Sequence, residues 1–153
     1  MKLSELLDEE NIIPDLKAKD KKGVLEELVD AVITSEPSID KQALVKVLLE
    51  RERLGSTGIG DGVAIPHGKY QGLSQPLISF GRSRDGLDFE SMDGQPAHLF
   101  FLLVAPENSA NVHLKVLATI ARILKNSGFR KALMEAPTRE DILKQILAYD
   151  EDF

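Results

Sequence analysis

One unbroken apolar run constrains the fold of this chain more than any other feature. Residues His98 to Ala105 read HLFFLLVA, with no polar position after the histidine. A strand with one face in water alternates apolar and polar residues, so a continuous run predicts a central strand that is covered on both faces. Such a strand favours a layered fold with helices packed against both faces of a sheet.

Amphipathic helices are predicted on both sides of this strand along the chain. Asp20 and Asp40 are suitable N-caps for two of them, and Thr138 opens a third with a capping-box-like pattern that ends at Asp141. Apolar residues recur at helical spacing after each cap. The predicted helices are a short one at Leu3–Leu7, then Lys21 to about Thr34, Lys41–Leu54, about Ala110–Lys125, Phe129–Met134, and a last one from Thr138 through Leu147.

The remaining regular segments have strand character. Short predicted strands cover Val63–Pro66, Leu77–Ser83 and Leu87–Phe89, and an extended piece ends near Leu16. Asp85-Gly86 is a hairpin signal, and Asp93-Gly94 marks a second turn. We therefore expect an α/β fold, a single-domain sandwich over residues 1–153 with a mixed sheet of about five strands flanked by helices on both sides. The 153 residues, 42% of them hydrophobic, suffice for one core.

Charge and composition exclude several classes of function. The net charge of −6 argues against a nucleic-acid partner. The chain has no cysteine, which excludes disulfides and thiolate chemistry and suits a reducing compartment. The N-terminal segment lacks the apolar core of a signal peptide, and no apolar run is long enough to span a bilayer. We expect a cytoplasmic protein without membrane insertion.

The segment Arg51–Lys69, RERLGSTGIGDGVAIPHGK, is the candidate functional region. It contains five glycines, a density that implies sharp turns or a close approach of the backbone to another group, such as a phosphate. Neither nucleotide motif fits. A Walker loop needs Ser or Thr after its Gly-Lys, where this chain has Tyr70, and the glycine spacing is not that of a dinucleotide fingerprint. The glycines instead precede a short predicted strand with His67 at its end.

Three side chains in or near this region are candidates for chemistry. His67 is either a strand-end histidine that bonds a loop or a nucleophile that accepts a phosphoryl group on its neutral ring. His113, in the first turn of a predicted helix, is either a satisfied core-edge histidine or a donor to an anion. Arg51, in register with a buried helical stripe, either packs its stem and pairs with a carboxylate or binds phosphate oxygens.

Other candidates are weaker. His98 begins a buried strand and is interpreted as structural. A metal site built from His67, His98 and His113 matches no known ligand spacing, so no metal or cofactor is expected. No serine or threonine of the glycine-rich segment has the context of a nucleophile elbow, which disfavours a hydrolase triad.

The residues LGSTGIGDGVAIPHGK resemble the phosphorylation-site motif of IIA proteins of the bacterial phosphotransferase system, of the fructose/mannitol and nitrogen type. The similarity continues through DGQPAHLFFLLVAPENSANVHLK and covers nearly the whole chain. In that family the histidine of the Pro-His-Gly run is phosphorylated, which implies His67. The family also has a second histidine beside the phosphorylated one, and the resemblance implies that this is His113. It has an assisting arginine ahead of the glycines, and the resemblance implies that this is Arg51.

The resemblance also implies a function and partners. The chain would be a phosphohistidine carrier that accepts phosphate from an HPr-like protein, itself supplied by Enzyme I and phosphoenolpyruvate, without being a self-contained enzyme. The nitrogen type is favoured, in which the phosphorylation state alters binding to regulatory targets. Two alternatives stay open: a sugar-specific IIA component that passes phosphate to a separate IIB domain, and a binding module that carries no phosphate.

Overall fold

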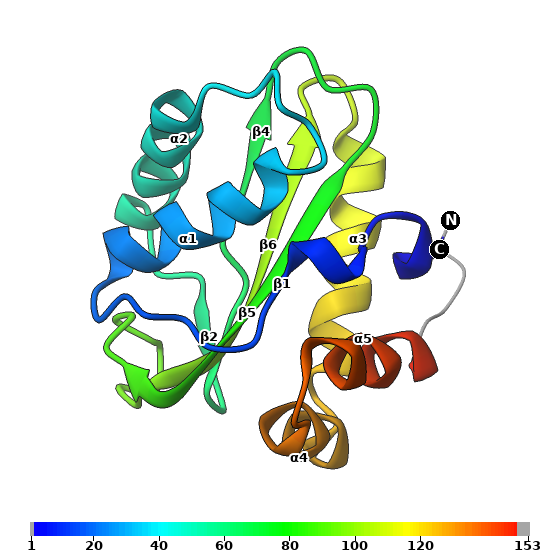
Figure 1. Ribbon diagram of the computed structural model, residues 1–153. Coiled ribbons are helices and arrows are strands. Elements are labelled where there is room, and N and C mark those ends of the chain that lie inside the picture. Colours follow the sequence, from blue (N-terminus) through cyan, green and yellow to red (C-terminus); the bar gives the residue numbers. More distant parts are fainter. Residues whose placement is uncertain (1, 150–153) are drawn as a thin grey trace.

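The computed structural model describes residues 2–149, in which a mixed sheet lies between two layers of helices (Figure 1). Helices α1 (Lys21–Ile33) and α2 (Lys41–Arg53) pack against one face. Helices α3 (Ala110–Ile123), α4 (Ser127–Glu135) and α5 (Arg139–Ala148) pack against the other. The predicted α/β sandwich with helices on both sides of a mixed sheet is confirmed.

The strand β6 is the centre of the sheet. Among residues 2–149 the sheet has six strands, where the sequence suggested about five. Strand β5 pairs antiparallel with one edge of β6, and β3 and β4 both pair parallel with its other edge. Residues 99–105 are fully or almost fully buried, which confirms the prediction of a strand covered on both faces. The strands are β1 (Ile12–Ile13), β2 (Gly58–Gly60), β3 (Val63–Ala64), β4 (His67–Tyr70), β5 (Leu77–Leu87) and β6 (Ala97–Pro106).

The predicted strand Val63–Pro66 is interrupted. Strand β3 ends at Ala64, and β4 begins at His67 on the same edge of β6, with two residues between them. Pro66 has no N–H to donate to a neighbouring strand, and the Ile65 N–H bonds the Thr57 carbonyl at 3.0 Å. His67 therefore opens a strand, where the sequence suggested that it closes one.

The hairpin predicted at Asp85-Gly86 is wrong. Strand β5 runs on to Leu87, which pairs with Ala97, and its register with β6 shifts after Arg82. Gly86 has a φ of 78°, so the Asp-Gly pair forms an irregularity within the strand. The predicted strand Leu87–Phe89 keeps only its first residue. The turn at Asp93-Gly94 is confirmed, since the Gly94 N–H donates to the Ser91 carbonyl.

The helix termini follow their predicted caps, with two differences. Asp20, Asp40 and Thr138 each accept a bond from the backbone N–H three residues later. Thr138 also donates its hydroxyl to the Asp141 carboxylate, so the reciprocal capping-box bond is replaced. The predicted opening helix is instead two 3-10 turns, Leu3–Glu5 and Glu9–Asn11. The Asn11 side chain fixes the second turn by accepting from the Asp8 N–H, just before the chain extends into β1.

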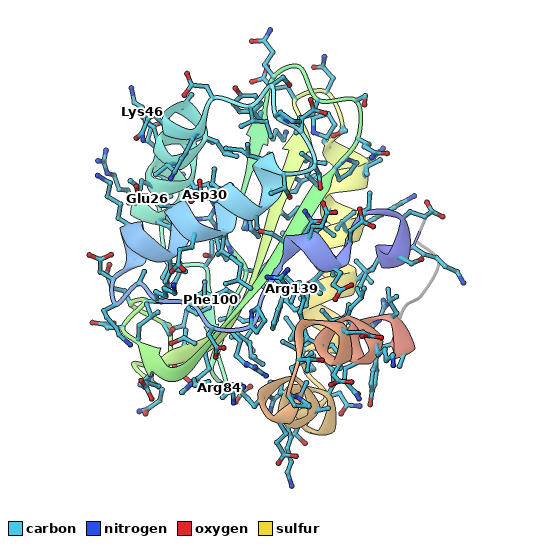
Figure 2. The ribbon with its side chains drawn as sticks, viewed as in Figure 1. Glu26, Asp30, Lys46, Arg84, Phe100 and Arg139 are labelled. Atoms are coloured by element: carbon cyan, nitrogen blue, oxygen red, sulfur yellow. The ribbon has the colours of Figure 1, made fainter. Side chains whose placement is uncertain are left out.

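The core consists of two halves, one on each face of the sheet. Phe80 packs edge-on against Phe101 on the α3 face, and Phe89 packs against Phe100 on the α1 face. Figure 2 shows Phe100 inside this second half, while Asp30 and Lys46 extend outward from α1 and α2. In the part of the chain that the structure describes, no helix has both the length and the apolar character to cross a membrane.

A buried arginine joins the sheet to the C-terminal helices. Arg82 of β5 is fully buried and donates its Nε to the Pro14 carbonyl at 3.0 Å. Its Nη1 donates to the carbonyls of Leu133 and Ala136 at 2.8 and 2.7 Å. These last two carbonyls lie at the C-terminal end of α4, where no further helical N–H groups are available to donate to them. Arg82 is thus a structural cation.

Candidate functional site

His67 is held by its own backbone at the point where the strand is interrupted. Its Nδ1 lies 2.8 Å from the carbonyl oxygen of Ile65. A carbonyl oxygen only accepts, so Nδ1 carries the proton in this contact. In the neutral ring the lone pair then belongs to Nε2. The local chain therefore selects one tautomer of a half-buried imidazole.

His113 lies against His67, although the two are far apart in sequence. Their ring centroids are 5.4 Å apart, and the planes meet at 71°. His113 is in the first turn of α3, is 8% exposed, and its buried Nδ1 has no hydrogen-bond partner within residues 2–149. A buried polar nitrogen without a partner is unusual in a native protein, so packing alone does not account for His113. The structure brings these two predicted residues together.

Arg51 belongs to the same neighbourhood. It is half-buried in the last turn of α2, and its Nη1 donates to the Gly55 carbonyl at 2.9 Å. Its positive charge acts on His67 strongly enough to help lower the pKa of that ring. The carboxylate pairing considered from the sequence does not occur among the described residues, because Arg51 bonds the glycine-rich segment instead.

The protonation of both histidines is shifted in the same direction. Burial lowers the pKa of His67 below 6.5, and Arg51 adds to the effect, while the bond to Ile65 and the charge of Glu52 oppose it. Burial also lowers the pKa of His113, together with the charges of His67 and Lys69. Both rings are thereby kept neutral at pH 7, the form in which a ring nitrogen is a nucleophile.

The glycines serve the geometry of the chain. Gly60 and Gly62 have φ values of 101° and 77°, and with Asp61 between them they reverse the chain from β2 into β3. Gly68 has a different reason: a Cβ there would meet Val47 Cγ1 of α2 at 3.0 Å. The sharp turn and the close approach foreseen from the sequence both occur. The amides of Thr57 and Gly58, however, bond side chains and form no open anion cradle.

A buried carboxylate beside Arg51 was missed from the sequence. Glu52 accepts from the Thr57 N–H at 3.0 Å, from the Thr57 hydroxyl, and from Lys21 Nζ at 3.3 Å. Lys21 also pairs with Glu90 at 3.3 Å. The only available signal was an acidic residue next to Arg51 at the end of a helix, which is ordinary for a solvated helix face.

His98 lies apart from the histidine pair. Its Nδ1 is 3.0 Å from the Ser83 carbonyl, and its ring borders Gly86 of β5, as suits the structural role expected of it. Over the described range, no three or more His, Cys, Asp or Glu side chains form a group that could hold a metal ion. The three-histidine metal site is therefore not assembled.

Comparison with known proteins adds to this geometry. A "PTS system fructose-specific EIIABC component" of Bacillus subtilis is 41% identical over 150 residues, which is 98% of this chain and 24% of that protein, so the chain spans about a quarter of this relative. A "Nitrogen regulatory protein" of Bradyrhizobium diazoefficiens is 46% identical over 135 residues, 87% of this chain and 86% of that one.

A solved structure and a family model agree with these relatives. The nitrogen regulatory protein IIA-Ntr of Neisseria meningitidis superposes with a TM-score of 0.88 at 35% identity, over 94% of this chain and 98% of its own. The model of the phosphoenolpyruvate-dependent sugar phosphotransferase system EIIA 2 family matches residues 5–149. The chain therefore belongs to the EIIA 2 family of the phosphoenolpyruvate-dependent sugar phosphotransferase system.

Proposed function

We propose that this chain is a phosphohistidine carrier in which His67 accepts the phosphoryl group. The observation that carries the proposal is the pairing of two neutral histidines. His67 donates its Nδ1 proton to the Ile65 carbonyl, which leaves Nε2 as the nucleophile. The ring of His113 lies 5.4 Å from that of His67, measured between centroids, and its Nδ1 has no hydrogen-bond partner among residues 2–149. Family membership supports the same role.

In the proposed transfer, the Nε2 lone pair of His67 attacks the phosphorus of a phosphohistidine on the donor. A new N–P bond forms as the donor's N–P bond breaks, and the bonding electron pair returns to the donor ring. The Nδ1 proton stays on the Ile65 carbonyl bond throughout. Arg51 and His113 stabilise the phosphoryl oxygens, and positioning with charge stabilisation suffices for this chemistry. No nucleotide or metal takes part.

The donor is proposed to be an HPr-like protein. Four exposed large apolar side chains belong to segments that build the site or bond to it, namely Leu54, Ile59, Met92 and Leu114. Leu54 is three residues after Arg51, and Leu114 follows His113 directly. Leu54 and Leu114, which are close in sequence to two of the site residues, would offer apolar contacts to a docking protein. Residues 1–153 would act as a single domain in the cytoplasm.

The acceptor is proposed to be a regulatory target of the nitrogen type. A phosphoryl group adds about −1.5 to −2 charges at pH 7, enough to repel an acidic partner and favour a basic one. The second candidate is a sugar-type carrier that passes phosphate to a separate IIB domain, and the fructose-specific relative favours it. Transfer assays with phosphorylated protein and candidate IIB domains distinguish the regulatory carrier from the sugar-type carrier, because rapid loss of label to IIB supports sugar uptake.

Intact mass after incubation with phosphoenolpyruvate, Enzyme I and an HPr-like donor tests the central proposal. Wild type should gain one phosphate, His67→Ala should gain none, and the matched control His98→Ala should still gain one. A fully labelled His67→Ala variant would contradict the site. A wild type that binds the phosphorylated donor but stays unlabelled would support the binding module instead.

A further inference from the structure

The missed carboxylate Glu52 is the starting point of a hydrogen-bonded chain. Its side chain is 3% exposed and accepts the Thr57 N–H, the Thr57 hydroxyl and Lys21 Nζ. Burying a carboxylate is costly unless it is paired and hydrogen-bonded, so these contacts hold Glu52 and Thr57 in one arrangement. Thr57 thus has both of its donors fixed on one group.

Thr57 in turn supports the interrupted part of the strand. Its carbonyl accepts the Ile65 N–H at 3.0 Å. Ile65 lies in the gap between β3 and β4, so it has no register partner on β6. The contact with Thr57 extends the antiparallel pairing of β2 with β3, in which Gly58 faces Ala64, by one residue. Thr57 thus holds the Ala64–Ile65 peptide, which joins the Ile65 carbonyl through the Cα of Ile65.

The carbonyl of the same residue, Ile65, accepts the Nδ1 proton of His67 at 2.8 Å. The chain of contacts thus runs from Glu52 through Thr57 and Ile65 to the imidazole. Lys21 fixes the outer end, because it bonds Glu52 and Glu90 and lies 4.7 Å from the centre of the Phe89 ring. The Glu52 carboxylate and the His67 imidazole are therefore linked through the backbone of Thr57 and Ile65, which hydrogen bonds hold at both ends.

We propose that Glu52 and Thr57 are positioning residues for His67, which hold the Ile65 carbonyl so that the ring keeps its proton on Nδ1 and presents Nε2. This inference rests on the proposed carrier function of His67. Neither residue touches the phosphoryl group. A misplacement of about 1 Å at a reacting atom costs up to about 100-fold in rate, so a loosened Ile65 peptide reduces transfer without removing the acceptor. The charge of Glu52 acts on the ring independently, since it opposes the fall in the pKa of His67.

Thr57→Val tests the chain of contacts without changing any charge. It removes the hydroxyl that Glu52 accepts and keeps the shape of the side chain. We expect the transfer rate to fall about 10-fold with unchanged affinity for the phosphorylated donor, because the ring is less well oriented. In ¹⁵N spectra of the histidine rings, the fraction of His67 protonated on Nδ1 should fall. Thr57→Ser keeps the hydroxyl and should restore both values.

Ser79→Ala is the matched control, because it also removes a buried hydroxyl. Ser79 is fully buried and donates to the Leu28 carbonyl, away from the chain of contacts. It should change neither the tautomer of His67 nor the transfer rate. Equal slowing by Ser79→Ala and Thr57→Val, or an unchanged tautomer and rate in Thr57→Val, would overturn the proposal.

Glu52→Gln provides a second variant if Thr57→Val does not fold. It should also slow transfer and reduce protonation at Nδ1, and the pKa of His67 should fall further because a negative charge is removed. A wild-type tautomer, rate and pKa in this variant would also overturn the proposal. If wild-type protein is not labelled by a competent donor, the carrier function fails, but the ¹⁵N comparison still decides whether Glu52 and Thr57 set the tautomer.

Discussion

Two arginines of this chain use the same side chain in opposite ways. Arg82 is fully buried. Its Nε donates to the carbonyl of Pro14, just after β1, and its Nη1 donates to two carbonyls at the C-terminal end of α4. Arg51 is half-buried and bonds one carbonyl, that of Gly55, at the edge of the histidine pair. A guanidinium enclosed by carbonyls contributes to folding, whereas one that a ligand can reach is available for function.

The largest expected effect is on stability, in Arg82→Met. Methionine fills part of the space but leaves several buried carbonyls of α4 without a donor, so we expect a loss of about 3 kcal/mol in the free energy of unfolding. Urea denaturation measures it. Arg84→Met is the control, since Arg84 is exposed and its ion pair with Asp15 should contribute less than about 1 kcal/mol. Equal small losses in both variants would remove the structural distinction.

The next effect is on transfer, in Arg51→Ala. We expect the rate of phosphoryl transfer to His67 to fall about 30-fold, or about 2 kcal/mol in the barrier, because a cation facing the phosphoryl oxygens is lost. Its stability should change by less than about 1 kcal/mol. Single-turnover labelling measures the rate. Arg53→Ala, an exposed arginine in the same helical turn, should transfer like wild type. A stability loss as large as that of Arg82→Met would place Arg51 in the structural class.

The smallest effect is on the protonation of His67. Removal of the Arg51 charge should raise the pKa of His67, and Arg82→Met should leave it unchanged, as followed by NMR titration of the ring proton. Because the folded pKa lies below 6.5, the native state binds fewer protons than the unfolded chain. Stability is therefore retained above pH 6.5 and is lost as the pH falls through the folded value. Arg51→Ala should lose less over that range.

The elements that are recognisable in the sequence are those that satisfy a local rule. The caps at Asp20 and Asp40, the buried run of β6 and the amphipathic faces of α1 and α3 depend on neighbouring residues, and the structure confirms them. Strand β4 escaped prediction because His67–Tyr70 has no apolar alternation, and its extended form depends on pairing with β6. The Asp-Gly pair in β5 was wrongly interpreted as a hairpin, because a bulge within a strand and a hairpin turn share that sequence signal.

The residues of the candidate site likewise fall into those that a local sequence pattern indicates and those that only the fold brings together. His67, His113 and Arg51 stood out because each residue type was unusual at its position, and the structure places the two histidines in contact. The contact between Glu52 and Thr57 depends on the path by which the glycine-rich segment folds back onto the end of α2. No spacing rule in the sequence encodes that path. The tautomer of His67 likewise follows from a strand interruption that only the pairing of β6 reveals.

The absence of a side chain at Gly68 links the distance between α2 and the sheet to the arrangement of the candidate site. A single methyl group there would lie 3.0 Å from Val47 Cγ1 and 3.3 Å from Leu48 Cδ2, so these two side chains of α2 would have to shift to make room for it. Arg51 lies on the next turn of that helix, and His67 precedes Gly68 on β4, so any displacement of α2 at this contact would change the distance between the two. The close packing of β4 against α2 at Gly68 thus helps to set the distance between the Arg51 guanidinium and the His67 ring. A side chain at residue 68 would therefore bear on reactivity as well as on packing.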